Sequence, residues 1–151
     1  MNWHLVGDEL ERICRNELLQ RCPECEIIET KYDSVHGIDF AVRLRNGGIA
    51  IVEVKSAFGS VHGQQMTASW IADRLSPLLE SAIINAFSWG APVFRATYRV
   101  FAEKGVIRSA TPTGSLTWAE LFPNKPHPIK ATDFSFSHGQ AFIDGTYIKI
   151  T

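Results

Sequence analysis

The segment from His36 to Lys55, HGIDFAVRLRNGGIAIVEVK, constrains the fold of this chain more than any other. Apolar residues alternate with other residues from Ile38 to Leu44, and again from Ala50 to Val54 after the turn 46–48. Alternation with a period of two on both sides of a glycine-rich turn is typical of a β-hairpin. The segment therefore predicts two antiparallel strands that share one apolar face.

The register of this hairpin follows from the burial of that apolar face. If the two apolar sets share a face, opposed residues have numbers with an even sum, as for Leu44 opposite Gly48 or Ala50. A two-residue loop over 46–47 would give odd sums and would place the two sets on different faces. We therefore expect a three-residue loop or a bulge, with a glycine at positive φ.

This register places Asp39, Glu53 and Lys55 together on the second face of the hairpin. Opposed or diagonal residues on neighbouring strands lie roughly 5–8 Å apart. Two carboxylates at that spacing can share a divalent cation, and a lysine beside them can orient or deprotonate a water molecule. The alternative is a solvated face with surface ion pairs, each worth about 0–1 kcal/mol. Ala41 and Ile51 on the same face argue against that alternative, because they indicate that the face is covered.

Asp39, followed after thirteen residues by Glu53-Val54-Lys55, resembles the core motif of the PD-(D/E)xK nuclease superfamily. The proline of the motif's name is absent here, as it often is in that superfamily. The resemblance implies an α/β fold of the mixed α+β kind, a restriction-endonuclease-like core with a central mixed β-sheet flanked by helices. It also implies that Asp39 and Glu53 hold a divalent metal ion, that the backbone carbonyl of Val54 completes the site, and that Lys55 positions or activates water.

A second match lies near the start of the chain. The spacing of apolar residues predicts a helix over 3–21. Its string 7–11, GDELE, resembles the G-x-x-x-E opening helix of many PD-(D/E)xK nucleases, in which the glutamate reaches the metal site directly or through water. Glu11 matches that glutamate, and Glu9 is the alternative. A solvated helix charge is the competing interpretation for both.

The residues after the hairpin extend the resemblance. A short glycine-containing loop leads to a predicted helix over 64–75 with the pattern Gln-Met…Trp-Ile. This order resembles the PD-(D/E)xK toxin domains at the C-termini of contact-dependent growth-inhibition proteins and other bacterial polymorphic toxins. In the superfamily a glutamine on this helix often supports the site, and Gln65 is the match; an ordinary polar helix residue is the alternative. The resemblance covers residues 5–75.

The toxin resemblance implies a substrate, a cofactor, a partner and a location. The substrate would be DNA or tRNA, and the metal ion would be Mg²⁺, with Mn²⁺ or Zn²⁺ as alternatives. A cognate immunity protein would neutralise the domain, which would be secreted or delivered into the cytoplasm of a target bacterium. The competing functions are a solitary repair or restriction nuclease and a non-catalytic nuclease-like binding or immunity protein.

The length, hydropathy and net charge of the chain limit its domain count, its membrane association and the way in which it could bind nucleic acid. A chain of 151 residues fits a single domain over 1–151. No apolar run reaches the ~18–20 residues that span a bilayer, and no signal-peptide pattern is visible at the start, so we expect no membrane association. The net charge of −1 means that nucleic-acid binding would need a local basic patch. Candidate residues for that patch are Arg43, Arg45, Lys55, Arg74, Arg95, Arg99, Lys104 and Arg108.

The three cysteines form one C-x-x-C pair, Cys22 and Cys25, and a separate Cys14. A zinc site would want two more ligands, and no second pair exists. We interpret all three as unpaired thiols, with a disulfide as an alternative.

The remaining elements are predicted from periodicity and turn residues. A strand is expected over 25–32, and a helix from Ser76-Pro77 to the turn 90–92. Strands over 93–103 and 106–111, a helical turn over 118–122, a loop over 123–139 and a hairpin over 141–151 complete the chain. Arg95 and Arg99 share a face of the predicted strand 93–103 and could contact phosphates; a solvated face is the alternative.

Overall fold

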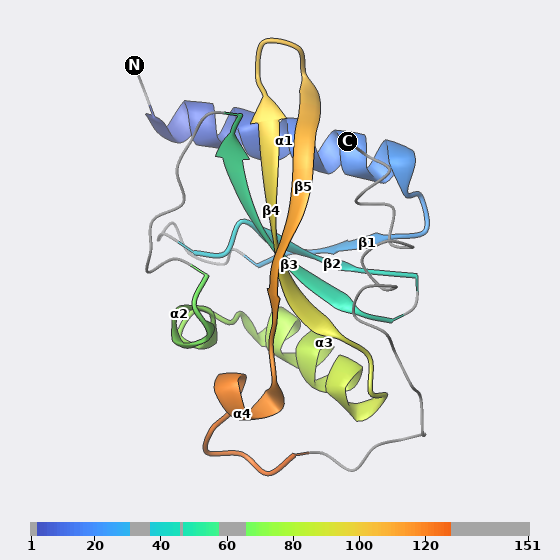
Figure 1. Ribbon diagram of the computed structural model, residues 1–151, viewed down its shortest axis with the longest axis vertical. Coiled ribbons are helices and arrows are strands. Elements are labelled where there is room, and N and C mark those ends of the chain that lie inside the picture. Colours follow the sequence, from blue (N-terminus) through green and yellow to red (C-terminus); the bar gives the residue numbers. More distant parts are fainter. Residues whose placement is uncertain (1–2, 31–36, 46, 58–65, 128–151) are drawn as a thin grey trace.

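The computed structural model describes residues 3–30, 37–45, 47–57 and 66–127. A five-stranded sheet, in the order β1-β2-β3-β4-β5, forms its centre (Figure 1). The sheet is mixed, because β3 and β4 are parallel while the other neighbouring pairs are antiparallel. Helix α1 lies on one face of the sheet and α2, α3 and α4 lie on the other. The predicted central mixed sheet flanked by helices is therefore confirmed.

Along the chain, the antiparallel strands β1, β2 and β3 come first, and a crossover connection then leads to the parallel strand β4. Their bounds are α1 Trp3–Arg21, β1 Glu26–Ile28, β2 Phe40–Arg43, β3 Ile49–Ser56, α2 Ala68–Ala72, α3 Pro77–Ser88, β4 Val93–Phe101, β5 Val106–Ser115 and α4 Trp118–Leu121. The chain returns from β3 to the parallel strand β4 by way of α2 and α3, since parallel neighbours need such a connection.

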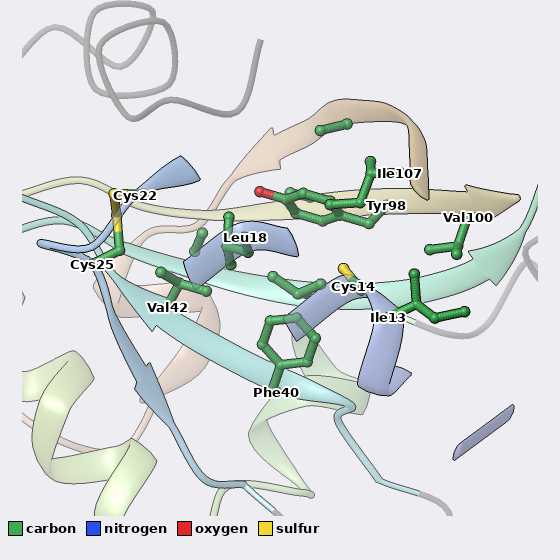
Figure 2. Close-up of a cluster of buried hydrophobic side chains, with 14 of the residues drawn as sticks. Ile13, Cys14, Leu18, Cys22, Cys25, Phe40, Val42, Tyr98, Val100 and Ile107 are labelled. Atoms are coloured by element: carbon green, nitrogen blue, oxygen red, sulfur yellow. A yellow bond between two sulfur atoms is a disulfide. The ribbon is translucent and has the colours of Figure 1, made fainter. Parts of the chain in front are cut away.

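The alternation in β2 and β3 divides their side chains between two cores. Phe40, Val42 and Val52 pack against α1, together with Leu18 and other residues of that helix (Figure 2). Side chains at odd positions, such as Ile51, pack against α3. Both faces of the sheet are buried there because helices cover each of them, as in other sheets with a parallel crossover.

The register predicted for the hairpin is confirmed. Phe40 is opposite Val52, so paired residues have an even sum. The amide of Leu44 donates a 2.8 Å hydrogen bond to the carbonyl of Gly48, which leaves three residues between the two. Gly47 has a φ of 89°, as the turn requires. Burial of one apolar set was thus sufficient to choose between the two loop lengths.

Several elements differ from the expected bounds. In the described part of the range 64–75, the expected helix is limited to α2, because Met66 has a φ of 66° and the Thr67 side chain caps the amide of Trp70. The strand expected over 25–32 is shorter, and that expected over 106–111 extends to Ser115. The helices beginning at Trp3 and Pro77 and the strand beginning at Val93 match their predictions. Gln65, the loop beyond residue 127 and the hairpin 141–151 lie outside the described residues.

The interpretation of unpaired thiols is wrong for two of the three cysteines. Cys22 and Cys25 form a disulfide in the turn between α1 and β1 (Figure 2). The amide of Cys25 donates to the carbonyl of Cys22, which closes a turn and brings the two Cα atoms to 5.4 Å. That separation is within the range that a disulfide spans. Cys14 is a buried thiol.

Across the described part of the chain, no helix combines the length and the apolar character needed to cross a bilayer.

Candidate functional site

Glu53 and Lys55 lie near the carboxyl end of β3 and form an ion pair. The ammonium of Lys55 is 3.1 Å from Oε1 of Glu53, and the two side chains are 18% and 6% exposed. Alternate positions on a strand point to the same face, which here is the face opposite α1. A buried carboxylate requires a charged or hydrogen-bonding partner, and Lys55 provides one for Glu53.

Asp39 is anchored to the residue between these two. Its Oδ2 accepts a 2.7 Å hydrogen bond from the amide of Val54. Strand β2 begins only at Phe40, so the Asp39 carboxylate occupies the place where a further backbone partner of β3 would otherwise lie. The N–H and C=O of one strand residue point to the same neighbouring strand. The carbonyl of Val54 therefore faces the side on which Asp39 lies.

The position of Asp39 differs in one respect from the expected alternation. Ile38 was expected on the same face as Phe40, but it packs in the core beneath α3, whereas Phe40 packs against α1. The alternation therefore stops between these two residues. The Asp39 carboxylate is bonded to the backbone amide of Val54, the residue between Glu53 and Lys55.

Helix α1 brings Glu11 to the same region through Arg15. Nη2 of Arg15 is 3.3 Å from Oε1 of Glu11 and 3.5 Å from the backbone oxygen of Asp39. The guanidinium also donates two 2.7 Å hydrogen bonds to Glu29 and lies 5.0 Å from the centre of the Phe40 ring. The bonds to Glu29 are the largest cause of a raised pKa of Arg15. Arg15 thus links the Glu11 carboxylate to the backbone at Asp39.

The alternative on α1, Glu9, is not part of this region. It is exposed and forms an ion pair with Arg12 on the outer side of the helix. Of the two glutamates, the structure therefore brings only Glu11 towards Asp39.

The thiol of Cys14, on α1, lies in a buried and negatively charged environment. Burial is the largest cause of the raised pKa of its thiol, and the negative charges of Asp39, Glu17 and Glu11 raise it further. The thiol therefore stays protonated at neutral pH. Its position one helical turn from Glu11 could have been read from the sequence, but the charges that surround it could not.

Two residues of β4 lie next to the ion pair: Arg99, which was expected to contact phosphates, and Thr97, which was not predicted for the site. Thr97 is opposite Glu53 and Arg99 is opposite Lys55 in the parallel register. Paired residues of neighbouring strands share a face, so both lie beside the ion pair. Arg95, which was paired with Arg99 in the phosphate-contact hypothesis, instead donates a 2.9 Å hydrogen bond to the carbonyl of Met66.

The oxygen donors of this region suit one class of metal ion. They are the carboxylates of Asp39 and Glu53 and the carbonyl of Val54. Within the described ranges, no group of three or more His, Cys, Asp or Glu side chains is arranged to hold a metal ion. Mg²⁺ is commonly bound through only one or two carboxylates together with water and substrate phosphates. Zn²⁺ prefers nitrogen and sulfur ligands, so the donor set fits Mg²⁺ or Mn²⁺ better than Zn²⁺.

Comparisons with protein-family models, with curated proteins and with solved structures gave no match to this chain.

Proposed function

We propose that this chain is a metal-dependent endonuclease that hydrolyses phosphodiester bonds in DNA or tRNA. One observation carries the proposal: the Asp39 carboxylate is bonded to the amide of Val54, and Val54 lies between the ion-paired residues Glu53 and Lys55. Asp39 thereby accepts a hydrogen bond from the backbone of the residue between Glu53 and Lys55 on β3. The arrangement of these residues at the end of β2 agrees with the core motif of the PD-(D/E)xK superfamily.

The residues of the site have distinct roles in this proposal. Asp39, Glu53 and the Val54 carbonyl would hold Mg²⁺, and Glu11 would approach the ion directly or through water. A bound divalent ion supplies positive charge to the phosphate and promotes ionisation of a water molecule. Lys55 orients that water or stabilises the negative charge that develops on the phosphate oxygens. Glu53 keeps the Lys55 ammonium next to the site, through the contact of 3.1 Å.

The biological setting is proposed on the resemblance to toxin domains. In that setting the chain is delivered into the cytoplasm of a target bacterium, and a cognate immunity protein protects the producing cell by covering the site. The order of the motif residues along the chain supports this interpretation. A solitary repair or restriction nuclease would use the same site on DNA.

A non-catalytic nuclease-like binding protein is the second candidate function. Its support is that the carboxylates of Glu53 and Glu11 already form ion pairs with Lys55 and Arg15. Such pairs satisfy buried charges without a metal ion. The two candidates differ in metal affinity and in activity.

The proposal predicts cleavage that depends on a divalent cation. The purified chain is incubated with supercoiled plasmid and with total tRNA, in Mg²⁺ or Mn²⁺ and with an excess of EDTA. We expect one of the two substrates to be cut, EDTA to stop the reaction, and added Mg²⁺ to restore it. Cleavage that is unaffected by EDTA, or no cleavage of either substrate in both metals, would contradict the proposal.

A further inference from the structure

Four basic side chains surround the carboxyl ends of β3 and β4, beside the candidate site. They are Lys55 on β3, Arg99 on β4, Arg108 on β5 and Lys104 in the turn between β4 and β5. We propose that these residues, called the basic ridge below, bind the phosphate backbone of a nucleic acid that crosses the sheet from β3 to β5. This inference rests on the proposed nuclease function, since it places the cleaved phosphate at Asp39 and Glu53.

Lys55 and Arg99 form the part of the basic ridge nearest to the candidate site. They are opposite each other in the parallel register of β3 and β4, so their Cα atoms are about one strand spacing, roughly 5 Å, apart on the same face. Two cations at adjacent positions repel each other. The Glu53 carboxylate offsets the charge of Lys55, and a phosphate bound at this position would be attracted by both cations.

The next residue of the basic ridge is Arg108, which a β-bulge directs towards the site. Arg99 is opposite Ser109 and Val100 is opposite Ile107, so Arg108 is an extra residue between two regular pairs of the ladder. Bulges of this kind redirect a side chain. Helix α1 also stabilises the bulge from the other face of the sheet, because the buried Glu17 carboxylate accepts a hydrogen bond from the amide of Ile107.

The bulge carries the Arg108 guanidinium across β4. Nη1 donates a 2.7 Å hydrogen bond to the carbonyl of Ala57, directly after β3, and the guanidinium carbon is 5.7 Å from the centre of the Phe101 ring. A guanidinium has five N–H donors, and the bond to Ala57 uses one of them. Arg108 is therefore held in place by a backbone contact, and a guanidinium is the group suited to bidentate phosphate contacts.

Lys104 extends the ridge beyond the end of β4. It is exposed, and its ammonium lies 5.2 Å from the centre of the Phe101 ring. Its neighbour Glu103 is the acidic residue of the same turn. Lys104 and Arg108 thus both contact one half-buried ring, which restricts the region that their charges occupy.

The extent of the ridge indicates the kind of anion that it binds. The cations are distributed over three neighbouring strands and a turn, whereas a single phosphate group could contact cations at only one place on this surface. A nucleic-acid strand presents a negative charge at every 3.4 Å of helix axis, so several phosphates can be contacted at once. The chain as a whole has a net charge of −1, and attraction of a polyanion therefore has to come from a local surface such as this one.

The test measures binding separately from cleavage. Fluorescence anisotropy in EDTA gives the affinity of the chain for a labelled single-stranded DNA, a duplex DNA and an RNA hairpin at several salt concentrations. The variants are Arg99→Gln, Arg108→Gln and the double variant. Lys125→Gln is the matched control, because it removes one positive charge from an exposed residue after α4 that pairs with Glu80. Arg99→Lys and Arg108→Lys keep the charge and show whether charge is the cause of any loss.

We expect each glutamine variant to bind the preferred nucleic acid roughly tenfold more weakly at ~0.1 M salt, with a salt slope smaller by about 0.7–0.9. The control and the lysine variants should keep most of the affinity, and far-UV circular dichroism should show that every variant is folded. The three probes identify which nucleic acid is preferred.

The outcomes separate this inference from the proposed function. If the glutamine variants bind like the wild type, or if Lys125→Gln loses as much affinity as they do, the proposal that the ridge binds nucleic acid is refuted even if the protein cleaves it. Failure of the wild type to bind any of the three probes would overturn it as well. Binding that depends on Arg99 and Arg108 without any cleavage would support the ridge and refute the endonuclease.

Discussion

Alanine at Asp39, Glu53 or Lys55 is expected to reduce cleavage of nucleic acid by about 10²–10³-fold or more, because each variant removes a charge that acts on the phosphate or the water. Asp39→Ala removes the acceptor of the Val54 amide, and Glu53→Ala removes the partner of Lys55. Loss of the hydrogen bond to Val54 costs about 1 kcal/mol of folding stability, which leaves the domain folded. Initial rates with the preferred substrate measure the effect.

The control for this experiment is Glu26→Ala. Glu26 lies on β1 and pairs with Arg43, and its side chain is 63% exposed. Its removal should leave the cleavage rate within about twofold of the wild-type rate, because exposed ion pairs contribute little to stability. Wild-type activity in all three site variants would show that the active site lies elsewhere on the chain.

Phe40→Ala is expected to lower the free energy of unfolding by about 3–5 kcal/mol, the range for removal of a buried aromatic side chain. The Phe40 ring is fully buried between the sheet and α1 (Figure 2), and the Arg15 guanidinium lies 5.0 Å from its centre. Substitution leaves a cavity in the core that joins β2 to α1. Urea denaturation followed by circular dichroism measures the loss.

The matched control in the opposite layer is Leu78→Ala. Leu78 lies on α3 and is 60% exposed, and alanine is a strong helix former. Its substitution should change the free energy of unfolding by no more than ~0.5 kcal/mol. A cost below 1 kcal/mol for Phe40→Ala, in a protein with cooperative unfolding, would refute the packing of β2 against α1.

The hairpin could be predicted from the sequence because burial of one apolar face admits a single parity of register. Period-two alternation fixes which residues share a face, and this information is local to the residues 38–55. The same reasoning placed Glu53 and Lys55 on one face, where they form their ion pair. It failed at Ile38, because alternation holds only within a strand and β2 begins at Phe40.

Other features of the site depend on contacts between distant segments. The register of β3 and β4 brings Arg99 beside Lys55, although 43 residues separate them in the sequence. The bulge at Arg108 depends on the packing of Ile107 against α1, and no turn residue marks it. The Cys22–Cys25 disulfide depends on a local turn that the C-x-x-C spacing permits but does not require.

The most direct test of the central claim is calorimetric titration of the chain with Mg²⁺ and with Mn²⁺, in the wild type and in an Asp39→Asn, Glu53→Gln double variant. The amides keep the shape of both side chains and remove their negative charges. We expect one metal ion to bind per chain at millimolar metal or below in the wild type, and this binding to be lost in the double variant. No binding by the wild type in this range, or equal binding by both proteins, would contradict a metal centre at Asp39 and Glu53.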